Sequence, residues 1–157
     1  VTRNGNAVKH LKDEVAYTIT YVKIQTIRFP SMQYDIQPLP PVFEPIEVPQ
    51  MILQPVFENV FQHAQHTLSS GESLKLQMTY KTIGEDSVCI VIENNGSISD
   101  ERIGELQKNL EHVDRLTELT GLLNIHKRLK LFFGDMAGLS VGKSALGGLC
   151  VRICVMR

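Results

Sequence analysis

The sequence predicts one α+β domain, a two-layer sandwich in which helices cover one face of a mixed β-sheet. Two runs of alternating hydrophobic residues, SLKLQMTYKTI and SVCIVIEN, flank Gly84 and are typical of a β-hairpin. Four other segments carry hydrophobic residues at helical spacing. A chain of 157 residues that is 43% hydrophobic is long enough for one such core and too short for two.

The first predicted element is an amphipathic helix over about residues 7–28. Its hydrophobic residues recur on one side, at Leu11, Val15, Ile19 and Val22. The helix ends at Phe29, because the residue before a proline is pushed out of the helical region. A short strand over residues 32–37 follows. Five prolines then predict an extended surface loop over residues 38–49.

The remaining elements follow from capping residues and from periodicity. Pro49 suits the first turn of a second helix that runs to about residue 67. After the hairpin, Ser99 can cap a third helix over residues 100–113. Thr120 can cap a fourth helix over residues 121–134, which Gly134 closes. Two final strands, GLSVGKS and GLCVRICVMR, complete the sheet.

Charge and cysteine content limit the possible functions. The net charge of −1 gives no electrostatic field that would select nucleic acid. Cys150 and Cys154 are four residues apart in a predicted strand, about 13 Å, which is beyond disulfide reach. Together with Cys89 they are predicted to be buried thiols in a reducing compartment. No group of cysteines and histidines has the spacing of a metal site.

The segment LQPVFENVFQHA, residues 53–64, carries the clearest chemical signal. Its hydrophobic residues face a core at helical spacing, while Asn59 and His63 fall on a neighbouring stripe. A helix of this kind can hold an amide oxygen and an imidazole beside a bound ligand.

Four motifs in order resemble those of the LytS/YesM type sensor histidine kinases, whose ATP-binding domain has the Bergerat (GHKL) fold. The first resembles the helix that leaves the dimerisation region, with Asp13, Glu14, Tyr21, Ile24, Arg28 and Phe29. The second resembles the N box, with Glu58, Asn59 and His63. The third and fourth resemble the adenine-binding and glycine-rich motifs, with Asn94, Asn95, Gly96 and Ile98, and with Gly121, Leu122, Asn124 and Arg128.

The resemblance implies a role for each of these site residues. Asn59 would bind Mg²⁺, which prefers oxygen ligands, and the catalytic residue Glu58 would assist phosphoryl transfer. The other ATP-binding residues would be His63 at the phosphates, Asn94, Gly96 and Ile98 near adenine, and Gly121 and Leu122 at a helix N-terminus that receives phosphate. Residues 98–119 would form a mobile ATP lid.

The resemblance also implies the organisation of the whole protein. Residues 1–30 would be the helix leaving the dimerisation and phosphoacceptor region, and residues 31–157 the ATP-binding domain. With ATP and Mg²⁺ as cofactors, this domain would phosphorylate a histidine upstream of the fragment. The partners would be its own phosphoacceptor domain, a second copy in a homodimer and a response regulator, without nucleic acid. The fragment would be a cytoplasmic domain of a membrane protein.

Four positions depart from the motifs and define an alternative function. Asn94 replaces the adenine-binding acid, Ile98 and Leu119 replace glycines, and Gln62 replaces a lysine. Losses of about 1 kcal/mol at each would weaken ATP binding roughly a thousandfold. These departures favour a degenerate pseudokinase that acts in docking or signal relay, whereas the intact Glu58 and Asn59 favour an enzyme. A third hypothesis, an unrelated α+β binding domain, would require all four motif resemblances to arise by chance in the same order.

Overall fold

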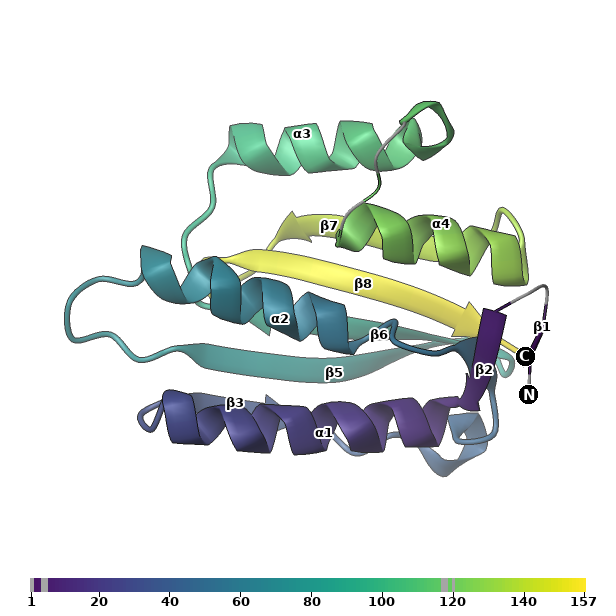
Figure 1. Ribbon diagram of the computed structural model, residues 1–157, viewed down its shortest axis with the longest axis horizontal. Coiled ribbons are helices and arrows are strands. Elements are labelled where there is room, and N and C mark those ends of the chain that lie inside the picture. The colour runs from purple at the N-terminus through teal and green to yellow at the C-terminus, as the bar shows by residue number, and fades with distance from the viewer. Residues whose placement is uncertain (1, 4–5, 117–118, 120) are drawn as a thin grey trace.

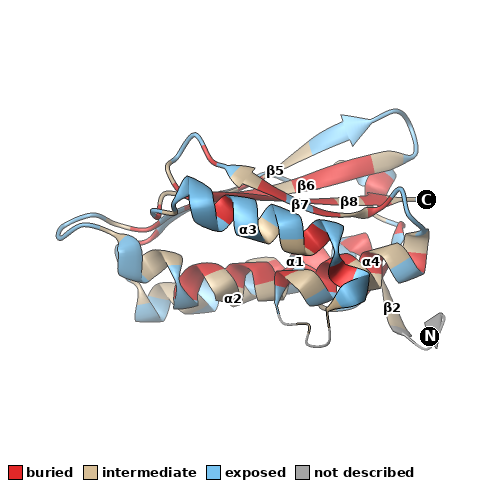
Figure 2. Cartoon of the chain, turned by 90° about the horizontal axis from the view of Figure 1, so that it is seen from above, coloured by how far each residue is buried: buried red, intermediate tan, exposed pale blue. Residues whose placement is uncertain are grey.

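A five-stranded sheet with helices over one face forms the two layers of the computed structural model, which describes residues 2–3, 6–116, 119 and 121–157 (Figures 1 and 2). The strand order is β3-β5-β6-β8-β7. These strands are β3 (Gln33–Ile36), β5 (Lys75–Ile83), β6 (Ser87–Asn94), β7 (Gly138–Lys143) and β8 (Leu149–Met156). Strand β3 runs parallel to β5 and the other pairs are antiparallel, so the predicted mixed α+β sandwich is confirmed.

Side-chain alternation divides the sheet into a buried and an open face. Ile90 and Ile92 of β6 lie opposite Ile153 and Val151 of β8, and all four are buried beneath the helices. Arg152, on the other face, is exposed. Because a strand buries alternate residues, the hairpin pattern in the sequence correctly predicts which residues enter the core.

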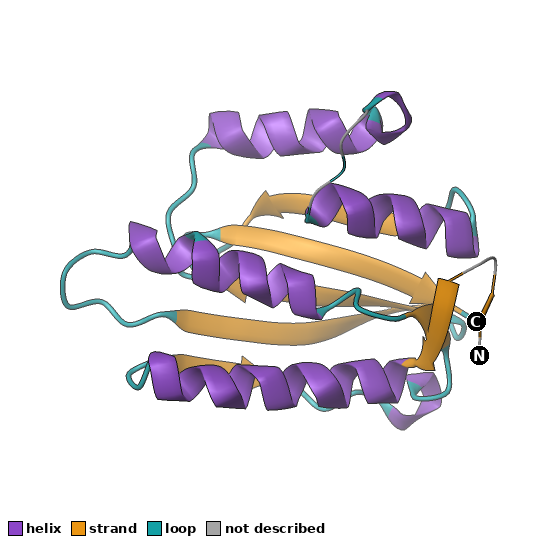
Figure 3. Cartoon of the chain, in the orientation of Figure 1, coloured by secondary structure: helices purple, strands orange, loops and turns teal. Residues whose placement is uncertain are grey.

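The helices of the second layer are α1 (Leu11–Arg28), α2 (Gln54–Gln62), α3 (Asp100–Glu111) and α4 (Leu122–Phe133) (Figure 3). Short 3₁₀ turns lie at Pro41–Phe43, Ala64–Thr67 and Val113–Arg115. Helix α1 ends before Pro30 and α4 ends at Gly134 with φ 101°, both as predicted. Thr120, the predicted cap of α4, lies outside the described residues.

The predicted N-terminal boundaries are wrong at two places, and strand pairing explains both. Residues 7–10 belong to β2 (Asn6–His10) and not to the first helix. Strand β2 pairs with β1 (Thr2–Arg3) and with β4 (Glu47–Pro49) in a small separate sheet. Pro49 therefore ends a strand opposite Val8, and the second helix begins only at Gln54. Partners forty residues apart leave no local signal in the sequence.

The proline-rich connection is not simply a surface loop. Phe43, Ile46 and Val48 within it are almost fully buried. The prolines break regular hydrogen bonding, but the hydrophobic residues between them still gain free energy from burial in the core.

The cysteine prediction is wrong for two of the three residues. Cys89 and Cys154 lie directly opposite each other on β6 and β8 and form a disulfide, which leaves Cys150 as the free, buried thiol. Opposite residues of an antiparallel pair place their Cβ atoms about 5 Å apart. Spacing within one strand cannot reveal such a pair, because the partner belongs to another strand.

Helix α1 shares the core of the rest of the chain. Leu11, Val15 and Val22 belong to the same hydrophobic cluster as the buried residues of α2 and of the sheet. The division into two parts at residue 30 stays a prediction. Within the described part of the chain, no helix has the length and hydrophobicity needed to cross a membrane.

Candidate functional site

A cavity of about 550 Å³ lies between α2, the ends of β6 and β8, α3 and the start of α4. Its volume is within the range of small-molecule sites. Its wall contains both hydrophobic and polar residues, and the lining residues are Val56, Asn59, Val60, His63, Ala64, Thr67, Ile92, Asn94, Ser97, Ile98, Arg102, Leu106, Asn109, Gly121, Leu122, Leu123, Gly148, Leu149 and Val151. Six of the eight residues that the sequence nominated are among them.

Helix α2 contributes one wall with Asn59 and His63. Pro55 stands in its first turn, where a proline loses no helical hydrogen bond. Phe57 and Phe61 are buried in the core, which turns Asn59 toward the cavity. His63 lies one turn later at the end of the helix, where its N–H donates to the Asn59 carbonyl over 3.0 Å. The structure thus brings these two predicted residues together on one wall.

Glu58 lies on another side of α2 and is not part of the cavity wall. Its carboxylate accepts a 2.8 Å hydrogen bond from Gln54 one turn earlier. Burial raises the pKa of Tyr21 on α1, and the negative charge of the nearby Glu58 raises it further. The catalytic role of Glu58 stays a prediction.

Asn94, the last residue of β6, is almost fully buried at the base of the cavity. Its Oδ1 accepts a 2.8 Å hydrogen bond from the Gly96 N–H, and its Nδ2 donates to the Leu149 carbonyl over a long 3.5 Å. The side-chain oxygen of Asn94 is therefore already engaged in closing a turn. The assignment of oxygen and nitrogen follows from this hydrogen-bond network.

Gly96 supports the site without lining it. A Cβ atom at Gly96 would lie 2.8 Å from the Ala64 Cβ and 3.0 Å from the Thr67 Oγ1. Only glycine allows the turn after β6 to approach the 3₁₀ turn that follows α2 this closely. Ile98, two residues later, does line the cavity and takes up space where the related motif has glycine.

Gly121 and Leu122 line the cavity where α4 begins. Gly121 has φ 51°, a conformation that favours glycine. The first backbone N–H groups of a helix have no partner within the helix and carry the positive end of its dipole. This end of α4 can therefore receive an anionic group from a ligand.

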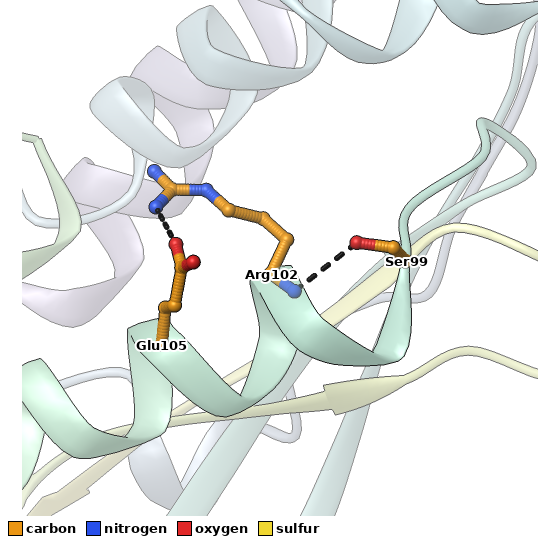
Figure 4. A network of polar contacts seen from close by, with 3 residues as sticks. All are labelled: Ser99, Arg102 and Glu105. Atoms are coloured by element: carbon orange, nitrogen blue, oxygen red, sulfur yellow. Dashed lines mark hydrogen bonds and ion pairs between the residues drawn. The ribbon is translucent and has the colours of Figure 1, made fainter.

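Helix α3 contributes a part of the wall that the four motifs did not predict. Arg102, Leu106 and Asn109 line the cavity, and none of them belongs to the four motifs. Figure 4 shows Ser99, which caps the helix by accepting a hydrogen bond from the Arg102 N–H over 3.1 Å. The Arg102 guanidinium is 3.0 Å from Glu105. The spacing of 102, 106 and 109 puts them on one helical face, which is the signal that was available.

Contacts with β7 hold α3 over the site. Gln107 donates to the Val141 carbonyl over 3.0 Å, and Lys143 donates to the Ile98 carbonyl over 2.6 Å. Ile103 and Leu110 are buried beneath the helix. The predicted lid segment is therefore mainly a packed helix across its described residues, and its predicted mobility stays a prediction.

The donor set fits a hydrated magnesium ion better than a metal held by the protein alone. In the described part of the chain no three His, Cys, Asp or Glu side chains gather as a metal site. Mg²⁺ keeps several waters and is bound mainly by phosphates, so one protein oxygen is sufficient. Asn59, partly exposed on the cavity wall, can supply that oxygen.

Comparisons with known proteins bear on this arrangement. No protein-family model matches the chain. The sensor protein kinase HptS of Staphylococcus aureus is 27% identical over 159 residues, which cover 99% of this chain and 30% of HptS. An uncharacterized sensor-like histidine kinase of Staphylococcus epidermidis is 26% identical over 157 residues, 96% of this chain and 29% of that protein. The chain thus spans about three tenths of the length of these curated relatives.

Solved structures of histidine kinase domains share the fold of this chain. The ATP-binding domain of PrrB from Mycobacterium tuberculosis superposes with a TM-score of 0.59 at 16% identity, covering 96% of both chains. The mycobacterial sensor histidine kinase MprB gives the same TM-score and identity over 96% of this chain and 97% of that chain. The predicted Bergerat fold is confirmed, whereas the LytS/YesM subfamily stays a prediction. The chain is thus a relative of the sensor histidine kinases and has the fold of their ATP-binding catalytic domain.

Proposed function

We propose that this chain binds Mg-ATP in the cavity and transfers the γ-phosphoryl group to a histidine outside the chain, as the catalytic domain of a LytS/YesM type sensor histidine kinase. The observation that carries the proposal is the convergence of three motif segments, around Asn59, Asn94 and Gly121, on one cavity. These segments are far apart in sequence. Their meeting at a site of suitable volume supports a shared ligand, and no comparison favours the pseudokinase alternative.

Phosphoryl transfer depends mainly on positioning and on stabilising charge, and the wall offers groups for both. Magnesium, when bound, would neutralise charge on the phosphates, and Asn59 would hold it. His63 and the start of α4 would contact phosphate oxygens. Gln62 is uncharged, exposed and outside the cavity wall, so it supplies no positive charge to the phosphates. Arg102, which lines the cavity, would add that charge. Glu58 would act at the histidine that receives the phosphoryl group.

The partners belong to the same proposal. The chain would work beside its own dimerisation and phosphoacceptor region, in a homodimer of the full-length protein, and would serve a response regulator. It would be the cytoplasmic part of a membrane sensor. The similarity to a sensor protein kinase and to a sensor-like histidine kinase supports this arrangement.

Titration of ATP, with and without Mg²⁺, into the purified chain tests the function directly. We expect magnesium-dependent binding that is weak, because Asn94 and Ile98 alter the base-binding end of the cavity. Calorimetry measures the dissociation constant. No heat and no thermal stabilisation at millimolar Mg-ATP would contradict the proposal, and low micromolar binding would contradict the predicted weakness.

Restoring the acid in Asn94→Asp should tighten ATP binding by about three- to tenfold, because a carboxylate is a stronger acceptor for the adenine amino group than an amide is. Asp keeps the acceptor for the Gly96 N–H but loses the donor to the Leu149 carbonyl, so we expect some loss of stability. Dissociation constants for ATP and GTP give the readout. An equal gain for GTP, or no gain for ATP, would show that residue 94 does not read the base.

A further inference from the structure

Among the motif residues without a part in the proposed function, Glu14 and Arg128 both contact the turn that precedes α2. Glu14 of α1 is 1% exposed, and Arg128 of α4 is half-buried. A buried carboxylate is costly unless hydrogen bonds compensate it. The partners of Glu14 therefore indicate what it does.

Glu14 caps α2 from another helix. Its Oε1 accepts hydrogen bonds from the backbone N–H groups of Ile52, at 2.7 Å, and Leu53, at 3.3 Å. Leu53 is the N-cap residue of α2 and has no side-chain oxygen to perform this task. The carboxylate also lies at the positive end of the α2 dipole. The Glu14 Oε2 has no hydrogen-bond partner within the described part of the chain.

Arg128 holds the same turn through its carbonyl groups. Its guanidinium donates to the Met51 carbonyl over 3.2 Å and to the Gln50 carbonyl. Met51 has φ 59°, an unfavourable conformation for a residue with a side chain. Such a conformation persists only where its surroundings impose it. The carbonyls of this turn are thus held from α4 and its amides from α1.

The other end of α2 is also fixed to α1. The Phe61 ring stacks on Phe29 with centroids 5.5 Å apart and meets Tyr21 edge-on at 6.0 Å. Asn59 lies between this aromatic cluster and the turn at residues 50–53. Because α2 is a short helix of nine residues with both ends in contact with α1, we expect the two helices to move as one body.

We propose that Glu14 and Arg128 are positioning residues that set the orientation of α2, so that the placement of α1 controls how Asn59 and His63 meet the nucleotide. This inference rests on the proposed Mg-ATP site for its functional consequence. Helix α1 holds the amides of the turn before α2 and helix α4 holds its carbonyls, so a displacement of α1 is transmitted to the wall of the cavity. Helix α1 is then the route by which the rest of the protein adjusts the site.

The test compares Glu14→Ala, Glu14→Gln and Arg128→Gln with Val22→Ala, a control in the same helix. Val22 is fully buried, so its truncation destabilises the core without touching the turn. Dissociation constants for Mg-ATP are measured well below each melting temperature, so that only folded protein is compared. We expect Glu14→Ala and Arg128→Gln to weaken binding about two- to thirtyfold.

Glu14→Gln separates positioning from stability. The amide keeps the Oε1 acceptor but leaves its NH₂ group without a partner, so we expect a lower melting temperature with near-normal affinity. Val22→Ala should likewise lower the melting temperature and leave the affinity for Mg-ATP near normal. The inference would be overturned if folded Glu14→Ala bound Mg-ATP with wild-type affinity. If Glu14→Ala does not fold, the same result in Arg128→Gln would overturn it.

Hydrogen exchange of the ligand-free proteins keeps the inference separate from the proposed function. We expect faster exchange at residues 52–62 in Glu14→Ala and Arg128→Gln than in Val22→Ala, relative to the sheet. If the wild type binds no Mg-ATP, the proposed function fails and this comparison still decides whether the two residues position α2. Uniform exchange changes in all variants would overturn the positioning role.

Discussion

Asn59→Ala should abolish the magnesium-dependent part of nucleotide binding and leave the fold intact. Asn59 is partly exposed on the cavity wall and offers the oxygen that a hydrated Mg²⁺ ion needs. Truncating a partly exposed polar side chain usually changes stability by less than about 0.5 kcal/mol, which corresponds to about 2 °C or less in melting temperature for a domain of this size.

Thermal melts with ATP, with and without Mg²⁺, measure both quantities for wild type and mutant. Gln62→Ala is a suitable control, since Gln62 is exposed on the same helix and outside the cavity wall. We expect the control to behave as wild type. Asn59→Ala could instead strongly lower the melting temperature without ligand and keep the magnesium-dependent stabilisation by ATP. Asn59 would then be a structural residue, and the metal assignment would be wrong.

Gly148→Ala should damage both stability and nucleotide binding, because no space exists for the added methyl group. A Cβ atom there would lie 2.0 Å from the Asn94 Oδ1 and 2.8 Å from the Asn94 carbonyl oxygen. The resulting shift of Asn94 disturbs the base of the cavity. Overpacking of this kind costs about 1–3 kcal/mol, and we expect a melting temperature lower by about 3–10 °C.

Gly142→Ala provides the matched control on the neighbouring strand β7. A Cβ atom there would meet nothing within 4 Å, and the backbone is not in the left-handed region. We expect stability equal to wild type or slightly higher, because alanine reduces the freedom of the unfolded chain. Equal effects of the two substitutions would contradict the close packing of Gly148 on Asn94.

The elements that the sequence predicted well are those with local signals. Ser99 before a helical pattern marks the start of α3, and its hydroxyl does cap the helix. Gly134 marks the end of α4. The hairpin of β5 and β6 follows from alternation around Gly84, whose φ is 64°. In each case the residues that decide the structure are neighbours in the chain, so the physical cause can be read from the pattern.

The motif residues of the site were predicted from resemblance, and the cavity brings most of them together. Asn59, His63, Asn94 and Gly121 come from three separate segments. Glu58 and Gly96 are the exceptions. The sequence placed Glu58 beside Asn59, but consecutive residues on a helix point about 100° apart, and Glu58 lies outside the cavity wall.

The sequence by itself determined the α+β class, the faces of the strands, most helix boundaries and the order of the motifs, because these depend on periodicity and on capping within a few residues. Only the tertiary structure decided the pairing of Val8 with Pro49, the Cys89–Cys154 disulfide and the hydrogen bonds from the turn before α2 to Glu14. Each of these joins segments distant in the chain. Their free energy comes from contacts that form only when the layers pack, and no local pattern encodes them.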